Sequence, residues 1–434
     1  MEVSFRLGRE QVGIVLPDGS PVYRSEFPAP DKPPEKAALD AVQDPIGSPP
    51  LRALLKQRGS GDVVVVVSDI TRPVPYTDFL DALLGEIQAG GVARSEILLL
   101  VATGMHRPCT PEELKEMIGP AAAKYRLLNH DPTDDDELAE LPGRSWAGSR
   151  VRINRRFAQA AFRIITGLVE PHFMAGFSGG RKAICPGIVD LETIRHFHGA
   201  EFMGDPNTRN ARLEGNPCHE EALSVARMAG VDFSLNVVMN RERKMVRAFA
   251  GDLEEAHERG CRFVREHACR RVEQPADLVV TSSGGYPLDA TFYQCVKGFV
   301  SALPAVRPDG RILAFGACSE GIGSDEYEEL MAEYADRPQE FLEEIRRPDC
   351  WRKDQWELQM QCRTLEKVGR DGLHFVTPGL NEKQLAKLGL TAHGAAPDRP
   401  GAAVQEVLDE LLQADATVSA FPEGPYCVPL PPEE

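Results

Sequence analysis

The clearest hydrophobic pattern in the chain lies between residues 63 and 101. Residues 63–67 are five consecutive valines, residues 97–101 read ILLLV, and residues 76–91 carry apolar side chains at helical spacing and end in two glycines. A strand without alternating polar residues is buried on both faces, as in a parallel sheet covered by helices. The pattern therefore predicts a parallel α/β arrangement.

Strand-like and helix-like segments continue to alternate along the rest of the chain. The helical residues 252–268 close a first region, and a new strand followed by a glycine turn begins near residue 274. We predict an α/β fold of two α/β domains with largely parallel sheets and a cleft between them. Residues 1–272 form the first predicted domain and residues 273–434 the second. For the proline-rich residues 426–434, both disorder and packing back on the first domain stay open.

The amino-acid composition leaves the predicted fold unchanged but excludes two classes of binding partner. With 434 residues, of which 42% are hydrophobic and 26% charged, the chain is long enough for two globular domains. Its 49 basic and 66 acidic residues give a net charge of −17, which repels nucleic acids and anionic membranes. Neither is therefore an expected partner.

Three further features favour the cytoplasm. Residues 1–15 alternate like a strand and lack the apolar core of a signal peptide. No segment approaches the roughly 18 consecutive apolar residues that span a bilayer. The ten cysteines include no C-x-x-C pair, which fits reduced thiols better than a zinc or iron–sulfur site. We therefore expect a cytoplasmic protein.

Polar and ionisable residues follow three of the predicted strands. Asp69 and Arg72 follow the valine run, His106 follows the next strand, and His172 follows the strand at 162–169. In open α/β sheets, ligands bind at the carboxyl ends of the strands. Two histidines there predict proton exchange beside an anionic ligand. The alternatives are an Asp69–Arg72 ion pair that caps the next helix, and histidines that serve only the structure.

The glycine-rich residues 176–187, GFSGGRKAICPG, are the most informative segment. Glycines allow backbone N–H groups to converge on an anion, and Lys182 adds a positive charge, so the segment predicts phosphate binding. It matches neither the Walker A pattern nor the G-x-G-x-x-G fingerprint. The alternative is a tight turn that needs positive φ angles.

Two histidines lie downstream of this segment on a predicted helix. His196 and His198 are two residues apart and diverge by about 200°, so at most one of them points into the site. A single histidine is a weak metal signal, because a protein-built zinc centre needs three or four ligands.

In the second domain, Tyr293, Gln294 and Lys297 lie three and four residues apart on a predicted helix. Such spacing brings them to one edge of the helix, where they suit a carboxylate and a hydroxyl group and could face the first domain across the cleft. The alternative is an ordinary solvated helix face.

Taken together, five segments in order along nearly the whole chain resemble the lactate racemase family, which uses a nickel-pincer nucleotide. They are SDITRP, ATGMHRP, EPHFMAGFSGGRKAICPGI, a later histidine, and YQCVK. The resemblance implies a pyridinium mononucleotide with two sulfur-bearing arms, joined through a thioamide to Lys182. It also implies nickel held by two sulfurs, a ring carbon and a histidine, for which His198 is the first candidate and His196 the second. Because the cofactor brings the other ligands, one histidine suffices.

The resemblance also assigns roles to the remaining candidates. His106 and His172 become the acid/base pair: one removes the hydroxyl proton while hydride leaves the same carbon for the pyridinium ring, and return to the opposite face of the 2-oxo acid inverts the centre. Arg72, Gln294 and Lys297 bind the carboxylate and hydroxyl groups of the substrate. Tyr293 lines the site, and either Trp351 or Trp356 lies near the cofactor. The implied cofactor contacts are Asp69, Ile70, Thr71 and Arg72, besides the attachment at Lys182.

The predicted activity is racemisation or epimerisation of a small, lactate-type 2-hydroxy acid. The expected partners are that substrate and the proteins that make the cofactor. The same chemistry on malate, an aromatic hydroxy acid or a sugar acid is the first alternative. A non-catalytic nucleotide or organic-acid binding protein and a phosphotransferase are the others.

Overall fold

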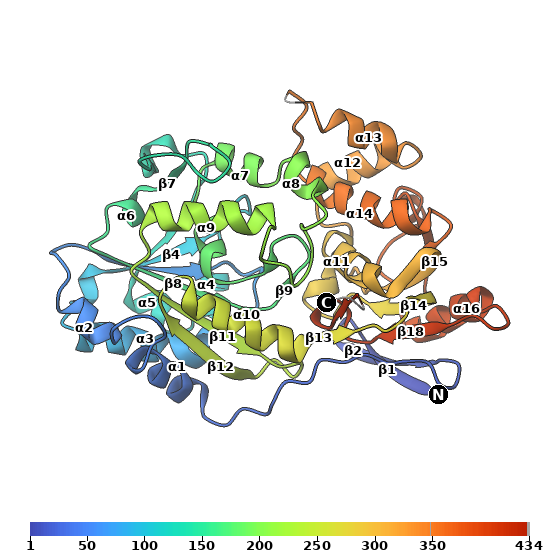
Figure 1. Ribbon diagram of the computed structural model, residues 1–434, viewed down its shortest axis with the longest axis horizontal. Coiled ribbons are helices and arrows are strands. Elements are labelled where there is room, and N and C mark those ends of the chain that lie inside the picture. Colours follow the sequence, from blue (N-terminus) through green and yellow to red (C-terminus); the bar gives the residue numbers. More distant parts are fainter. Residues whose placement is uncertain (348, 432–434) are drawn as a thin grey trace. The chain divides into compact units, whose positions relative to one another are not determined.

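The computed structural model describes residues 1–347 and 349–431 (Figure 1). The chain divides into two compact units. Unit 1 consists of Met1–Glu26, Gly199–Pro206 and Ala268–Glu434, and unit 2 consists of Phe27–His198 and Asn207–His267. Every helix among the described residues is too short or too polar to cross a lipid bilayer.

Unit 2 is built on a six-stranded sheet in the order β12-β11-β8-β3-β4-β5. All neighbours are parallel except β11 and β12. The five valines of β3 are fully buried, as predicted for a central parallel strand. The strands of this sheet are β3 (Val63–Ser68), β4 (Ile97–Ala102), β5 (Arg126–Asn129), β8 (Phe162–Leu168), β11 (Phe233–Met239) and β12 (Met245–Gly251).

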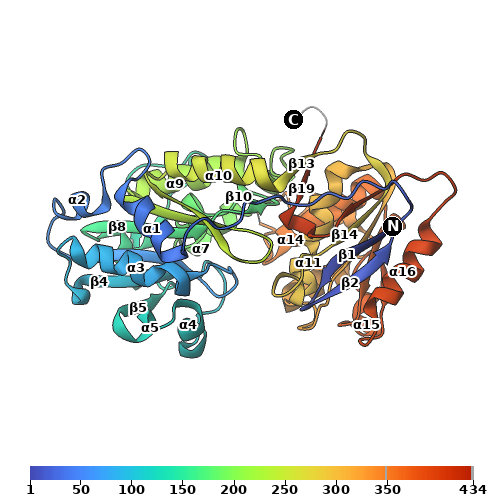
Figure 2. The same cartoon turned by 90° about the horizontal axis from the view of Figure 1, so that it is seen from below.

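Helices cover both faces of the sheet in unit 2. Val63, Val65 and Val67 pack with apolar residues of α1 and α3 on one face, and α9 and α10 lie on the other (Figure 2). Two small hairpins complete the unit: β6 (Leu138–Glu140) with β7 (Arg152–Asn154), and β9 (Pro171–His172) with β10 (Gly176–Phe177). The helices are α1 (Pro34–Gln43), α2 (Leu51–Leu55), α3 (Tyr76–Ala89), α4 (Pro111–Ile118), α5 (Ala121–Lys124), α6 (Arg155–Ala158), α7 (Leu191–Phe197), α9 (Pro217–Ala229) and α10 (Glu255–Ala268).

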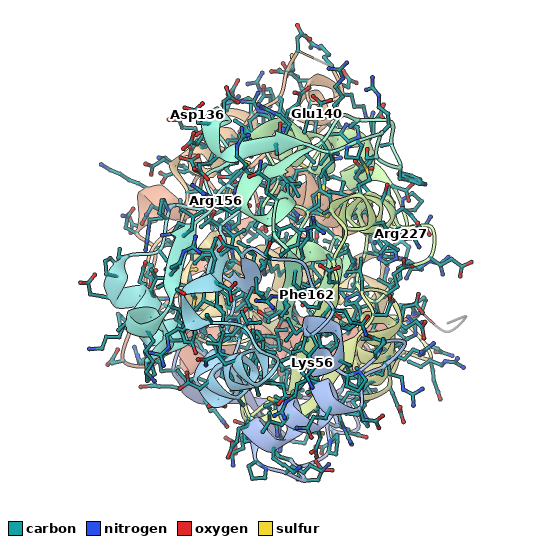
Figure 3. All side chains as sticks on the ribbon, turned by 90° about the vertical axis from the view of Figure 1, so that its left-hand side faces the viewer. Lys56, Asp136, Glu140, Arg156, Phe162 and Arg227 are labelled. Carbon is teal, nitrogen blue, oxygen red and sulfur yellow. The ribbon has the colours of Figure 1, made fainter. Side chains whose placement is uncertain are left out.

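One end of unit 2 carries many charged side chains, among them Asp136, Glu140, Arg156 and Arg227 (Figure 3). Arg156 pairs with Glu137 at 3.2 Å. An exposed ion pair contributes at most about 1 kcal/mol to the free energy of unfolding, so this face mainly keeps the unit hydrated.

Unit 1 contains an all-parallel sheet in the order β17-β16-β15-β14-β18. Its strands are β14 (Ala276–Ser282), β15 (Val306–Phe315), β16 (Leu373–Thr377), β17 (Thr391–Gly394) and β18 (Val418–Phe421). Its helices are α8 (Ala200–Gly204), α11 (Phe292–Ala302), α12 (Asp325–Tyr334), α13 (Pro338–Glu344), α14 (Gln355–Val368), α15 (Glu382–Leu385) and α16 (Pro400–Leu411). The predicted fold class, α/β with two domains and largely parallel sheets, is confirmed.

The division of the chain differs from the predicted 1–272 and 273–434. The N-terminal hairpin of β1 (Glu2–Leu7) and β2 (Glu10–Val15) belongs to unit 1, because its apolar face, which includes Phe5 and Ile14, packs into the core of the second sheet. Residues 199–206 also belong to unit 1. The alternation of polar and apolar residues in 1–15 indicates strands with one buried face, as found, but it does not show which sheet covers that face.

The described part of the C-terminal tail contains one strand. Its strand β19 (Val428–Leu430) pairs in parallel with β13 (Cys269–Arg271). The predicted first domain included residues 269–271, but the structure places both strands in unit 1. Residues 432–434 of the predicted tail lie outside the described part of the chain.

Candidate active site

Asp69 and His106 form the first pair of the site. Asp69 is the residue after β3 and is 3% exposed, and its Oδ2 lies 2.6 Å from Nδ1 of His106. Its Oδ1 accepts hydrogen bonds from the backbone N–H (3.2 Å) and hydroxyl (2.6 Å) of Thr71. Burial opposes ionisation of Asp69, but the hydrogen bonds from His106 and Thr71, with the charge of Arg72, leave its pKa below the ordinary value. The carboxylate therefore binds His106, instead of the ion pair with Arg72 that the sequence left open.

The Asp69 contact sets the hydrogen-bond polarity of His106. A carboxylate can only accept, so Nδ1 of His106 carries the proton that it donates, and Nε2 of the neutral ring carries the lone pair. The ring is about half exposed. A backbone hydrogen bond anchors the loop that carries His106: the N–H of Gly104 donates to the carbonyl of Gly187 at 3.0 Å. The loop that carries His106 is thereby tied to the glycine-rich segment.

The hydrogen-bond polarity of His172 is the reverse of that of His106. This residue is buried in β9, and its Nδ1 accepts hydrogen bonds from the backbone N–H groups of Met174 and Ala175, both at 3.3 Å. In the neutral ring the proton therefore sits on Nε2. That nitrogen lies 3.3 Å from Nζ of Lys182. Because an ammonium group can only donate, Nε2–H can bond to Nζ only when the amine is neutral. The structure thus brings together two site residues that the sequence predicted independently.

The glycines of the segment bend the chain. Gly176, Gly179 and Gly180 all have positive φ angles, between 52° and 75°. The N–H of Gly180 donates to Oδ1 of Asn236 at 2.8 Å, and the N–H of Lys182 donates to Gly179 at 3.2 Å. These two donors are used within the protein, and the positive φ angles agree with the tight-turn alternative; phosphate binding by the segment stays a prediction.

A close approach of two backbones needs glycine at two positions. A Cβ on Gly167 of β8 would lie 3.1 Å from Cα of Gly179, and a Cβ on Gly179 would lie 3.0 Å from both the carbonyl of Leu168 and Oδ1 of Asn236. The segment therefore lies directly on the end of β8.

Arg181 anchors the segment from inside, a role that the sequence did not reveal. The side chain is 1% exposed, and its guanidinium donates to the carbonyl of Ala175 at 2.7 Å and lies 3.0 Å from Nε2 of His257. Burial lowers its pKa to about 10, so it stays charged at neutral pH. Nothing in the pattern Arg-Lys shows which of the two side chains is buried. With Arg181 held in the core, Lys182 reaches His172.

His198 lies near Lys182, as the first of the two candidates for a metal ligand. Burial, followed by the positive charge of Lys182, lowers the pKa of His198 to about 3, so the ring is neutral at physiological pH. Its Nδ1 lies 3.1 Å from the carbonyl of Ile194, which places the ring proton there and the lone pair on Nε2. The ring of Phe197 is near both groups: Nζ of Lys182 lies 5.6 Å from its centroid, and the ring of His198 meets it edge-on at 4.8 Å. His196 is only half-buried.

These donors do not make a metal centre on their own. Among the described residues, no group of three or more histidine, cysteine, aspartate or glutamate side chains is placed to hold a metal ion. One neutral imidazole beside a lysine amine fits a metal that arrives with most of its ligands already in place. Lys182 and His198 thus fit the implied group.

In unit 1, the predicted substrate residues lie at the start of α11. Nζ of Lys297 donates a short hydrogen bond to Oε1 of Gln294, so the two side chains are joined as their spacing predicts. The hydroxyl of Tyr293 donates to Oδ1 of Asp354 at 3.2 Å and accepts from Nε1 of Trp356 at 3.0 Å. Asp354 thus contacts the first of these three residues, although it lies 61 residues away in the sequence and no local pattern pointed to it.

The two candidate tryptophans are now distinguished by their contacts. Trp356 bonds directly to Tyr293, whereas the ring of Trp351 lies 6.4 Å from that of Trp356. Of the two, Trp356 is the one connected to the YQCVK segment.

Comparison with known proteins gives consistent matches along the chain. A family profile described as the lactate racemase N-terminal domain matches residues 7–211, and one described as the lactate racemase C-terminal domain matches residues 272–425. The lactate racemase of Thermoanaerobacterium thermosaccharolyticum is 35% identical over 389 residues, which are 88% of each chain. The lactate racemase of Lactiplantibacillus plantarum is 37% identical over 331 residues, 75% of this chain and 76% of that one.

The fold agrees with these matches. The structure of the lactate racemase apoprotein from Thermoanaerobacterium thermosaccharolyticum superposes with a TM-score of 0.89 at 31% identity. The alignment covers 99% of this chain and 100% of that chain.

Proposed function

The chain belongs to the lactate racemase family, and we propose on this premise that it racemises or epimerises a small 2-hydroxy acid. In this proposal, a nickel-pincer nucleotide is joined to Lys182, and His106 and His172 exchange protons with the substrate. The observation that carries the proposal is that Nζ of Lys182 lies 3.3 Å from His172, whose hydrogen-bond polarity is the reverse of that of His106.

Lys182 and His198 are the residues that would hold the cofactor. The lysine provides an amine for covalent attachment, and the neutral imidazole of His198 provides a lone pair for nickel. The loop from Asp69 to Arg72, with Ile70 and Thr71, contacts the same group. When bound, the cofactor supplies a pyridinium ring as hydride acceptor.

The two histidines are prepared for different halves of the proton transfer. His106 presents an unprotonated Nε2, which can accept the proton of a substrate hydroxyl, and Asp69 stabilises the resulting imidazolium. In the neutral ring of His172, Nε2 carries the proton and can donate a hydrogen bond to a substrate oxygen. Transfer of a proton to the oxygen of a planar 2-oxo acid requires the imidazolium form of His172, which then returns to neutral imidazole. For the opposite enantiomer, His172 is the base and His106 the acid, so each ring must be able to gain and lose a proton.

Cationic and amide groups recognise the substrate. The guanidinium of Arg72 can bind a carboxylate through two parallel hydrogen bonds. Because Oε1 of Gln294 accepts from Lys297, the amide N–H₂ of Gln294 remains as a donor for the carboxylate or hydroxyl oxygen. Both groups of the pair on α11 therefore present donors, which suits an anionic substrate.

The first experiment tests attachment. We expect the protein produced alone to have the mass of its sequence, and the protein produced with the cofactor-making enzymes to carry an adduct. Lys182→Ala should abolish the adduct, whereas Lys56→Ala, at a lysine on the exposed surface of unit 2 (Figure 3), should keep it. An unchanged mass of the wild-type protein after co-production would contradict the proposal.

The second experiment tests activity. Single enantiomers of lactate, malate, an aromatic 2-hydroxy acid and a sugar acid are incubated with the loaded protein, and loss of optical purity is followed by chiral chromatography. Racemisation of lactate supports the first substrate, and racemisation of a larger acid alone identifies the alternative. If no acid is racemised by protein with full nickel occupancy, a non-catalytic binding protein replaces the proposal, and ATP turnover would instead identify a phosphotransferase.

A further inference from the structure

We propose that Asp354 is a positioning residue that fixes the Gln294–Lys297 face of α11 through the hydroxyl of Tyr293. The inference rests on the proposed function, since it assigns substrate binding to that face. It concerns unit 1 alone and does not involve the cofactor.

Asp354 joins the starts of three helices. Its Oδ1 accepts from the hydroxyl of Tyr293 in α11 at 3.2 Å, and its Oδ2 accepts from the hydroxyl of Ser324, the residue before α12, at 2.5 Å. Asp354 itself is the residue before α14, and Trp356 of that helix donates to Tyr293 at 3.0 Å. Asp354 is 6% exposed, so these bonds are shielded from water.

The backbone of Asp354 adopts a left-handed conformation, and its side chain does not cap the helix that follows. Its φ angle is 64° and its ψ angle is 7°, a left-handed conformation that glycine adopts at lower cost than aspartate. Aspartate before a helix commonly caps it, but the side chain of Asp354 makes no hydrogen bond to the first N–H groups of α14. The strained position is therefore occupied by a carboxylate whose two oxygens serve Tyr293 and Ser324.

Tyr293 transmits this constraint to the substrate face. Its hydroxyl donates to Asp354 and accepts from Trp356, and its ring meets that of Tyr327 edge-on at 5.5 Å. With its one donor already used, Tyr293 holds the helix in place instead of donating to a substrate. Gln294 is the next residue along the chain, and Lys297 lies one turn further, so fixing Tyr293 fixes the direction of both donors.

The test uses loaded enzyme with three substitutions at this position. Asp354→Gly keeps the left-handed backbone but removes the carboxylate, Asp354→Ala removes both, and Asp354→Asn keeps a side-chain acceptor and tolerates the backbone. The matched control is Asp415→Gly, because Asp415 has a similar φ angle of 69° but is exposed and lies outside this cluster.

We expect Asp354→Gly and Asp354→Ala to raise KM for the 2-hydroxy acid by about 10-fold or more while kcat changes by less than about 3-fold. Asp354→Asn should return KM to within about 3-fold of the wild type, and Asp415→Gly should leave KM unchanged. A purely structural role predicts loss of folded protein with a normal KM in the fraction that remains. A wild-type KM in folded Asp354→Gly protein would overturn the inference.

A second measurement separates this inference from the proposed function. Titration of the protein with pyruvate, followed by tryptophan fluorescence, reports binding without turnover. Weaker pyruvate binding by Asp354→Gly than by Asp415→Gly supports the positioning role even if no acid is racemised. Equal binding by the two variants counts against it, even if the wild type is an active racemase.

Discussion

The two units carry their chemistry in different ways. In unit 2, the candidate residues come from five separate points of the chain, at Asp69, His106, His172, Lys182 and His198, and meet only because strand ends and glycine turns bring them together. In unit 1, Tyr293, Gln294 and Lys297 lie within five residues of one helix. The first site is a product of the fold, and the second is a helix face that its neighbours hold in place.

This difference predicts whether a mutation in each unit alters the chemistry or the binding of substrate. In unit 2 the reacting groups are set by hydrogen-bond polarity, so a change of one acceptor or donor alters the chemistry. In unit 1 the helix period already aligns the donors, so changes there alter binding. Mutations of Asp69, His106 and His172 in unit 2 should therefore act mainly on kcat, and mutations on α11 of unit 1 mainly on KM.

The largest expected effect follows removal of either imidazole in unit 2. His106→Gln and His172→Gln should each lower kcat by about 10² to 10⁴-fold, the usual contribution of a general acid or base. The control is His130→Gln, because His130 is buried with its Nε2 2.9 Å from the carbonyl of Val189 and serves the structure. Steady-state kinetics and thermal unfolding check this. An equal loss of kcat in folded His130→Gln protein would contradict the prediction, because the loss would then not be specific to His106 and His172.

A smaller effect is expected from Asp69→Asn. The amide can present N–H₂ to Nδ1 of His106, which favours the tautomer with the proton on Nε2 and so removes the free base. We expect kcat to fall by about 10²-fold with KM within a few-fold of the wild type. Asp62→Asn, at an exposed pair with Arg126, is the control. A wild-type kcat for Asp69→Asn would show that the pair does not set the tautomer.

Substitutions on α11 should raise KM more than they lower kcat, unlike the substitutions in unit 2. Lys297→Ala and Gln294→Ala are each expected to raise KM by about 10-fold or more, with a lesser change in kcat, because each removes a donor that binds substrate before and during the reaction. Lys387→Ala, whose lysine pairs with Glu328 at the surface, should change neither constant. If Lys297→Ala lowered kcat as strongly as His106→Gln, the division of labour between the units would be wrong.

The smallest expected effect concerns pH and stability. Burial, followed by the charge of Arg181, lowers the pKa of His219 to about 3 and that of His257 well below its ordinary value. In the unfolded chain both residues bind a proton near pH 6.5, but in folded unit 2 they do not. The unfolded state therefore binds more protons below pH 6.5, and stability falls as the pH is lowered from 7 to 5.

We expect this acidification to lower the unfolding temperature of unit 2 by a few degrees more than that of unit 1. The variant Trp146→Phe keeps tryptophan only in unit 1, so its fluorescence follows that unit while calorimetry follows both. Equal shifts in the two signals would contradict the prediction.

The sequence predicted the fold class and the residues that meet in unit 2, because buried parallel strands have a clear pattern and their carboxyl ends share one edge. It did not predict that Asp69 binds His106, since the two are 37 residues apart and Arg72 offered a nearer partner. It also missed Arg181 and Asp354, whose burial depends on contacts with distant residues. For the N-terminal hairpin, the pattern indicated one buried face but not the sheet against which that face packs.

The absence of a Cβ atom at Gly167 has a consequence for the glycine-rich segment that packs on β8. A methyl group at this position of β8 would lie 3.1 Å from Cα of Gly179, so the backbone there would have to shift by a few tenths of an ångström. Such a shift would move the segment that leads to Lys182 although no reacting group had been altered. Gly167→Ala therefore changes the backbone beside the glycine-rich segment without removing any functional group.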